Sequence, residues 1–420
     1  MALAGSGSQV CNKSRSSLNG WELTWCSETK LNEETVEAIA TYLASPQSDA
    51  LHHLALSQCG LTARDVALLM HSMEREKGKA RSLHLYVGSS SLAHNSQDFI
   101  DCISQGRTPS HLTMRMVDYP KEEPFQEFIR ALTINKTIVY LDMGKISLPY
   151  EAGEKTSALL GKLFAENTTL RELDISGEQA VLESASLGAG LLNALSRIAE
   201  NKSLEILRIE RTCSPLLLLL AIIAFTDCML VQSLGTPGAM ELASMLPKNT
   251  TLRELHCEMN DIHLQGFTAM VNALEHNHTL LYLPRMDRDR IDQMRLLKEN
   301  LCQPAIPDTW DHRTHHPSSS SQIPEKEKKK SSFRKPSRTK KVSFSEEDAL
   351  MAVDVEQSLK LLEEKWESEV VRLQKLLSRN MNLRLQALRS GPAKAPIKRP
   401  GVHSAGSISS MALLWGVDGR

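Results

Sequence analysis

The chain lacks the sequence signatures that commonly identify an enzyme. Its 420 residues contain no H-E-x-x-H, no G-x-S-x-G and no set of protein-kinase motifs. The stretch from Ala152 to Ser157 has the lysine and threonine of a phosphate-binding loop, but its glycine and lysine are not adjacent and the leading glycine is missing. We therefore expect a binding protein without enzymatic activity and without a cofactor.

Closely paired cysteines, which often bind metal ions or form disulfides, are also missing. The eight cysteines are scattered along the chain, at Cys11, Cys26, Cys59, Cys102, Cys213, Cys228, Cys257 and Cys302. His312, His315 and His316 lie in a stretch rich in proline and serine, where solvated linker histidines explain them better than a metal site does. The first eight residues have neither the charged lead nor the apolar stretch of a signal peptide. We expect no metal and a reducing compartment, the cytoplasm, with the nucleus as a second location.

Long hydrophobic runs and a net charge are lacking too. The longest uninterrupted apolar run extends from Leu216 to Phe225, whereas a transmembrane helix needs about 20 such residues. The formal net charge is only −1, so total charge indicates no class of partner. The sequence therefore predicts neither a membrane span nor a nucleic-acid partner.

A repeated asparagine is the main positive feature of the chain. Five segments place it three residues before an apolar residue: Asn135-Lys-Thr-Ile138, Asn167-Thr-Thr-Leu170, Asn201-Lys-Ser-Leu204, Asn249-Thr-Thr-Leu252 and Asn277-His-Thr-Leu280. Each segment is also a glycosylation sequon, but in a reducing compartment an asparagine at a helix end or turn is the better interpretation. An internal repeat of this kind determines the architecture of a chain.

After the asparagine the unit reads L-x-x-L-x-L, as in Leu170, Leu173 and Ile175. Alternating leucines fill one face of a short strand, and the apolar residues that follow change to helical spacing. The unit resembles the leucine-rich repeat in its long, ribonuclease-inhibitor-like variety. That resemblance implies an α/β solenoid, or horseshoe, with strands near residues 54–56, 141–143, 173–175, 207–209 and 255–257 on its concave face.

The spacing of the repeats identifies one irregular segment. Weak strands near Leu83 to Leu85 and Leu112 to Met116 complete the series between Leu51 and Ile138, and the later steps are 32, 34, 48 and 28 residues. The step of 48 contains the apolar run, and removing about twenty residues there would restore the period. We predict that residues 213–233 are an insertion into the repeat, either a buried or disordered insertion or sequence that the native message would splice out.

Changes in composition divide the chain into five parts. We expect a disordered N-terminus at residues 1–20, the solenoid at 21–302, a basic disordered linker at 303–345, an amphipathic helix at 346–389 and a disordered tail at 390–420. The linker carries Lys328, Lys329 and Lys330 among its basic residues. These charges would suit a nuclear import receptor, nucleic acid or an acidic cytoskeletal surface, or they are simply solvated.

At the end of the linker stands Lys341-Val342-Ser343-Phe344, followed by three acidic residues. This segment resembles the docking motif of regulatory subunits of protein phosphatase 1. The resemblance implies an extended segment whose Val342 and Phe344 side chains enter adjacent apolar pockets, with Lys341 ahead of them and Leu350 and Met351 as further contacts.

Ser343 lies between the two anchor residues and follows basic side chains that suit a basophilic kinase. A phosphate there would place about two negative charges beside apolar pockets and weaken docking. The alternative is an unmodified serine that points to solvent.

The final helix should be amphipathic, because apolar residues fall on heptad positions. The residues that we expect to form its association stripe are Leu359, Leu362, Trp366, Leu373 and Leu376, with Ala352, Val355, Leu383 and Ala387 extending it. Glu369 and Asn380 are the polar exceptions, and Asn380 could fix the register of a coiled coil. Self-association and packing against the solenoid or the phosphatase are both open.

These features together predict a non-enzymatic scaffold. In this interpretation the chain is a regulatory or targeting subunit that binds the catalytic subunit of protein phosphatase 1, while the concave face holds a second, unidentified protein. The rival is a cytoskeletal adaptor similar to tropomodulin, which would use the repeats, the basic linker and the coiled coil on actin or microtubules.

Overall fold

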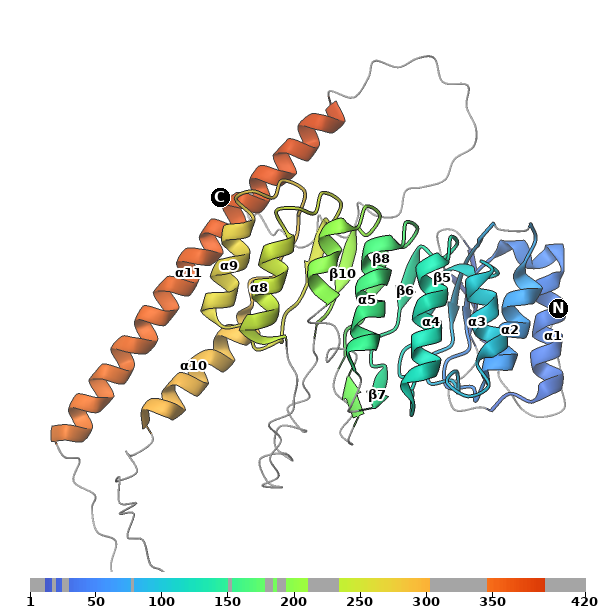
Figure 1. Cartoon of the computed structure of the whole chain (residues 1–420), viewed down its shortest axis with the longest axis horizontal. Helices are drawn as coiled ribbons and strands as arrows, with labels where there is room; N and C mark the ends of the chain where they lie inside the picture. The colour runs from blue at the N-terminus through green and yellow to red at the C-terminus, as the bar shows by residue number, and fades with distance from the viewer. Residues whose placement is uncertain are drawn as a thin grey trace, which may run out of the picture.

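The computed structural model describes residues 12–16, 20–24, 30–76, 79–149, 153–177, 184–186, 194–210, 234–302 and 346–389. They form a mixed α/β fold around a nine-stranded sheet with the strand order β1-β2-β3-β4-β5-β6-β8-β10-β11 (Figure 1). The first two strands, β1 (Asn12–Ser16) and β2 (Gly20–Thr24), are antiparallel, and every later neighbouring pair is parallel.

The parallel strands follow one another in chain order, and a helical segment accompanies most of them. The remaining strands of the sheet are β3 (Leu51–Ala55), β4 (Arg81–Tyr86), β5 (Pro109–Thr113), β6 (Tyr140–Asp142), β8 (Glu172–Asp174), β10 (Ile206–Arg208) and β11 (Glu254–His256). A separate antiparallel pair is formed by β7 (Ser147–Pro149) and β9 (Ser184–Ser186). The helical segments are α1 (Glu33–Ala44), η1 (Pro46–Ala50), α2 (Ala63–Met73), α3 (Gln97–Ser104), α4 (Glu122–Ile134), α5 (Glu154–Glu166), η2 (Leu195–Glu200), α8 (Gly235–Met245), α9 (Leu264–Ala273), α10 (Asp287–Cys302) and α11 (Glu346–Arg389).

A column of leucines joins the strands to the helices. One leucine from each parallel strand from β3 onward lies in register with the next, and all are fully buried: Leu54, Leu85, Leu112, Leu141, Leu173, Leu207 and Leu255. They share one continuous core with the apolar faces of the helices, such as Phe125 and Phe128 of α4. Because strand side chains alternate in direction, the residues beside each leucine point to the opposite face of the sheet.

The repeated asparagines form a buried ladder between neighbouring units. Each side-chain oxygen accepts hydrogen bonds from the backbone amides two and three residues later, at 2.6 to 3.0 Å. Each side-chain amide donates to the preceding unit, as Asn201 Nδ2 does to Phe164 O at 2.6 Å and Asn167 O at 3.3 Å. All five asparagines are at most 5% exposed. They are therefore helix-end residues whose polar atoms are already bonded within the fold.

The strands predicted from the sequence lie side by side and parallel, which confirms that part of the prediction. The weak strands near residues 83–85 and 112–116 correspond to β4 and β5. The strands β10 and β11 pair directly although the longest repeat step separates them, and residues 213–233, the predicted insertion, lie outside the described residues. One difference is β1, which lies inside the stretch 1–20 where we expected no regular structure and pairs with β2 at the edge of the sheet.

Helix α11 spans the predicted range and packs across the last units of the array (Figure 1). Trp366 is fully buried, stacks on Phe267 of α9 with ring centroids 5.4 Å apart, and donates a hydrogen bond from Nε1 to Arg285 O at 3.3 Å. An ion pair at 2.7 Å joins Arg290 of α10 to Glu367, and another joins Glu275 to Arg372. Of the two arrangements open at the sequence level, the structure shows the helix packed against its own chain.

The buried face of α11 differs from the predicted heptad stripe. Trp366 and Leu373 are buried as expected, and Leu376 is partly buried against the core. Leu359 and Leu362 are only half-buried, and Leu383 and Ala387 are exposed. Val370 is buried where the heptad places Glu369, because a straight helix with 3.6 residues per turn drifts away from a strict seven-residue stripe.

Two side chains of α11 form hydrogen bonds with the backbone carbonyls at the last step of the asparagine ladder. Leu274 stands three residues before Asn277, as Phe164 stands before Asn167, but no further repeat follows to bond its carbonyl. Arg379 supplies the missing donor, since its guanidinium bonds Leu274 O and Asn277 O, each at 2.7 Å. The neighbouring Asn380 is fully buried and donates to Leu280 O at 2.9 Å and Asn277 O at 3.2 Å.

Replacing Asn201 by alanine should destabilise the array, because two amides and two carbonyls would lose their buried partner. Leaving buried polar groups unsatisfied costs on the order of 3 kcal/mol in total. Asn272, an exposed residue of α9, is the matched control, and Asn272→Ala should change the free energy of unfolding by less than about 0.5 kcal/mol. Urea denaturation of the two variants measures both, and equal free energies would contradict a structural role for the ladder.

Replacing Arg379 by alanine should loosen α11, since the carbonyls that end the ladder would lose their donor. We expect faster amide hydrogen exchange over residues 366–380, with about a tenfold increase for a loss near 1.4 kcal/mol. Lys375 lies exposed on the same helix, so Lys375→Ala controls for the loss of a positive charge. Unchanged exchange in Arg379→Ala would show that the apolar contacts alone hold the helix.

Candidate functional site

The candidate binding surface is the face of the sheet opposite the helices, which we call the polar sheet face. It consists of three rows of residues. The first row holds the residue just before each leucine of the column, the second row holds the residue just after that leucine, and the third row holds the residue two positions after the second. In its first row, aligned by register, are His53, His84, His111, Tyr140, Glu172, Ile206 and Glu254. The second row holds Ala55, Tyr86, Thr113, Asp142, Asp174, Arg208 and His256.

Aromatic and imidazole rings gather on β3 to β6. His84 stacks on Tyr86 with ring centroids 3.9 Å apart and meets Tyr140 edge to face at 5.1 Å. His111 stacks on Tyr140 at 5.7 Å, and His53 lies 5.9 Å from His84. These five residues form a continuous ring cluster across four strands, and since strands are about 4.8 Å apart it extends about 15 Å.

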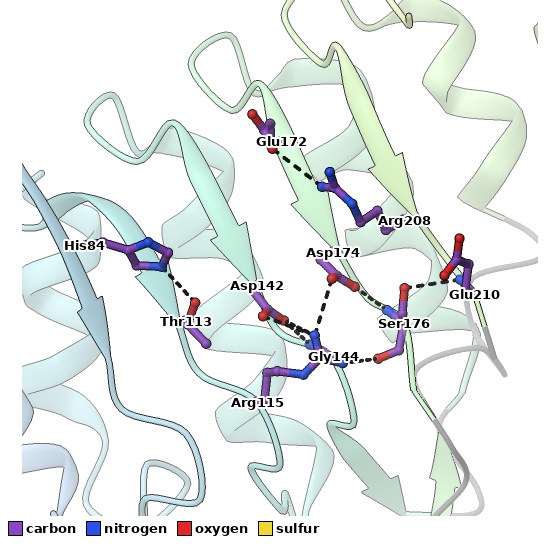
Figure 2. A network of polar contacts seen from close by, with 10 residues as sticks. All are labelled: His84, Thr113, Arg115, Asp142, Gly144, Glu172, Asp174, Ser176, Arg208 and Glu210. Atoms are coloured by element: carbon purple, nitrogen blue, oxygen red, sulfur yellow. Dashed lines mark hydrogen bonds and ion pairs between the residues drawn. The ribbon is translucent and has the colours of Figure 1, made fainter. Parts of the chain in front are cut away.

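The histidines at the centre of this cluster are uncharged at neutral pH. Burial lowers the pKa of His84 to about 4, and the neighbouring His111 and His53 add to the effect. Burial also lowers the pKa of His111. The Nε2 atom of His84 lies 2.9 Å from Thr113 Oγ1, which fixes the orientation of the ring (Figure 2). His84 and His111 therefore present neutral rings rather than cations.

Arg115 ties the middle of the face together just beyond the end of β5 (Figure 2). Its Nη1 atom lies 3.0 and 3.1 Å from the two carboxylate oxygens of Asp142 and 3.3 Å from Asp174. Burial alone would lower the pKa of Arg115, but the two carboxylates outweigh burial and raise it. Burial raises the pKa of Asp142, although hydrogen bonds from Gly144 N and Arg115 oppose that shift. Because Arg115 serves both carboxylates, it contributes no free positive charge to the surface.

Gly144 has no side chain, and this leaves room for the guanidinium of Arg115. A Cβ atom at Gly144 would overlap the carbonyl of Ser176 and lie 2.7 Å from Arg115 Cζ. Any other residue at this position would displace the guanidinium from the two carboxylates. Glycine at position 144 is therefore required by packing rather than by a special backbone conformation.

The far end of the face, on β8 to β11, is rich in carboxylates. Arg208 lies 3.5 Å from Glu172, and His256 lies between Glu254 at 3.2 Å and Glu210 at 3.4 Å. Burial alone would lower the pKa of His256, but its hydrogen bonds to Glu210 and Glu254 outweigh this and raise it. Burial and the nearby Asp289 and Glu210 raise the pKa of Glu258.

Of the residues predicted to dock the phosphatase, Leu350 and Met351 belong to the described part of the chain, near the start of α11. Lys341, Val342, Ser343 and Phe344 lie outside the described residues. Sequence analysis did not single out the ring cluster. The signal was present, because aligned triplets such as His84-Leu85-Tyr86 and Tyr140-Leu141-Asp142 place rings at the outward positions of adjacent strands.

The ring cluster and the carboxylates of this face are groups that could contact a binding partner. Among the residues that the structure describes, no group of three or more His, Cys, Asp or Glu side chains is placed to hold a metal ion. Within the same ranges no helix is both long and apolar enough to cross a membrane. Cys59 and Cys257 are fully buried in the core.

Replacing Arg115 by methionine should destabilise the protein at pH 7 by on the order of 3 kcal/mol, because two poorly solvated carboxylates would lose their counterion. The Asp142 pKa, already raised, should rise further, so protonation would stabilise the native state and the loss should shrink as the pH falls toward 4. The exposed ion pair of Arg171 with Glu205 is the control, and Arg171→Met should cost less than about 1 kcal/mol. Urea titrations at pH 7 and pH 4 provide the test. A loss of unfolding free energy in Arg115→Met that is the same at both pH values would contradict this account.

The comparisons with known proteins identify no family. No protein-family model matches the chain, and no curated protein matches it with significance.

Proposed function

We propose that the protein is a leucine-rich-repeat scaffold that targets the catalytic subunit of protein phosphatase 1. In this proposal the repeats form a horseshoe-like solenoid, and the polar sheet face holds a second protein. The segment Lys341-Val342-Ser343-Phe344 docks the phosphatase. The observation that carries the proposal is the docked helix α11, which begins two residues after Phe344 and is fixed to the array.

The position of α11 indicates how far from the array the docking segment would be attached. The helix begins at Glu346 and reaches its buried anchor at Trp366 twenty residues later. At 1.5 Å per residue, the docking segment would be attached about 30 Å from that anchor. A phosphatase held there would stay close to whatever the polar sheet face binds, as a targeting subunit requires.

The chemistry of docking follows from the spacing of the two anchor residues. Val342 and Phe344 are two residues apart, so in an extended segment both side chains point to the same side. Added to a sheet edge through backbone hydrogen bonds, such a segment would insert the two side chains into adjacent apolar pockets. A phosphate on Ser343 would bring negative charge beside those pockets and weaken the complex.

Truncating Val342 and Phe344 to alanine in the full chain should weaken phosphatase binding strongly. Each anchor should contribute on the order of 2 kcal/mol, which is at least about a tenfold loss of affinity per residue. Ser343→Glu should lie between this loss and the smaller, salt-sensitive effect of replacing Lys328 to Lys330. Titration calorimetry with the purified catalytic subunit measures all of these variants.

The matched control is Val371→Ala, which removes the same atoms from an exposed position on α11 and should leave the affinity unchanged. If the unmodified chain fails to bind the catalytic subunit at tens of micromolar, the phosphatase proposal is wrong. The cytoskeletal adaptor similar to tropomodulin would then become the better hypothesis.

A further inference from the structure

The polar sheet face has an unequal charge balance that limits the kind of partner it can hold. Six carboxylates lie on its three rows: Asp142, Glu172, Asp174, Glu210, Glu254 and Glu258. The guanidinium groups on the same rows are those of Arg115 and Arg208. The hydrogen bond with His256 lowers the pKa of Glu254, and the nearby charge of Arg384 of α11 adds to that effect. Even if protonated His256 is counted with the three guanidinium groups, four cations stand against six carboxylates, so the described face is acidic.

The cations that the strand rows contribute to this face are already engaged. Arg115 bonds Asp142 and Asp174, and Arg208 lies beside Glu172. His256 is held between two carboxylates. An anionic partner such as a nucleic acid or an acidic peptide would therefore meet excess negative charge.

The ring cluster provides a second kind of contact on the same face. Tyr140 belongs to the cluster, and Asp142 follows it two positions later on β6, so the rings and the carboxylates adjoin. The flat faces of tyrosine rings attract cations, and a guanidinium group also stacks on them more readily than an ammonium group does. Neutral rings beside excess carboxylates are the surface that an arginine side chain matches best.

We propose that the polar sheet face binds an arginine-bearing basic segment of a partner protein, with arginines stacked on the ring cluster and paired with Glu210 and Glu258 at the carboxylate-rich end. The inference builds on the proposed role of this face in holding a second protein, but it does not depend on phosphatase docking. The seven strands β3 to β11 that form the face, at about 4.8 Å per step, span about 30 Å. A segment of roughly ten extended residues would cover that length.

The test uses the full chain and a fluorescently labelled peptide of twelve alternating arginine and serine residues. Binding is followed by fluorescence anisotropy, and a peptide with glutamate in place of arginine provides the reference. We expect the arginine peptide to bind and the glutamate peptide not to bind. Equal binding of both peptides, or binding of neither, would overturn the proposal.

Variants locate the contact on the protein. The double variant Glu210→Gln, Glu258→Gln should weaken binding about tenfold. Its matched control, Glu166→Gln with Glu241→Gln, removes the same two charges from exposed helix positions and should change affinity less than about twofold. Equal losses in both pairs would mean non-specific attraction and contradict the assigned site.

The ring cluster has a separate variant, Tyr140→Leu, which removes the ring and leaves the carboxylates of Glu210 and Glu258 in place. Binding should fall by about threefold to tenfold if arginines stack on the cluster. Thermal unfolding of each variant verifies that the fold is retained. A folded Tyr140→Leu protein with unchanged affinity would overturn the stacking contact.

The basic stretch of the chain's own linker is the competing occupant. Replacing Lys328, Lys329 and Lys330 by glutamate in the full chain should leave the affinity for the arginine peptide unchanged or raise it less than twofold. A large increase would mean that the linker occupies the face, which contradicts a partner segment. The variant Val342→Ala, Phe344→Ala should bind the peptide normally, so failure here and failure of phosphatase docking remain distinguishable.

Discussion

The buried asparagine that follows each of the helical segments α4, α5, η2, α8 and α9 is the interaction on which this part of the array depends. Parallel strands separated by helices leave backbone amides and carbonyls at every turn, and those groups are buried between neighbouring units. One amide side chain satisfies the turn of its own unit with its oxygen and the preceding unit with its nitrogen, as Asn201 does. The ladder therefore sets the spacing of the units, and the leucine column fills the space between sheet and helices.

The same constraint explains why α11 is part of the structure. A ladder of identical donors leaves the last carbonyls without a partner, and the last helix leaves apolar side chains such as Phe267 uncovered. Trp366 covers the apolar surface, while Arg379 and Asn380 bond the carbonyls of Leu274, Asn277 and Leu280. These contacts hold α11 beside the array.

Much of the fold could be predicted from the sequence, because its strongest signals are local and repeated. The asparagine and leucine spacing predicted parallel strands in the right order, and apolar periodicity predicted the bounds of α11. The buried side of α11 was predicted only in part. A heptad pattern assumes a supercoiled partner, whereas this helix packs on α9 and α10, which buries Val370 in place of Glu369 and leaves Leu383 exposed.

The candidate site was harder to predict because its contacts join distant residues. Arg115 meets Asp174 across 59 positions of sequence, and Gly144 is needed because that guanidinium and the carbonyl of Ser176 both lie against it. His84 and Tyr140 become neighbours once strand register is known. The outward positions of the strands do not pack into the leucine core that recurs in each unit. Their side chains can therefore differ from unit to unit and form the candidate binding surface of this chain.

The central claim is that the chain has two separate binding elements, the proposed docking segment around Val342 and Phe344 and the polar sheet face. Hydrogen–deuterium exchange of the full chain with and without the phosphatase catalytic subunit tests this claim most directly. The account predicts protection confined to about residues 338–351, with the exchange of β3 to β11 unchanged. Protection of the strands, or no protection around Val342 and Phe344, would contradict it.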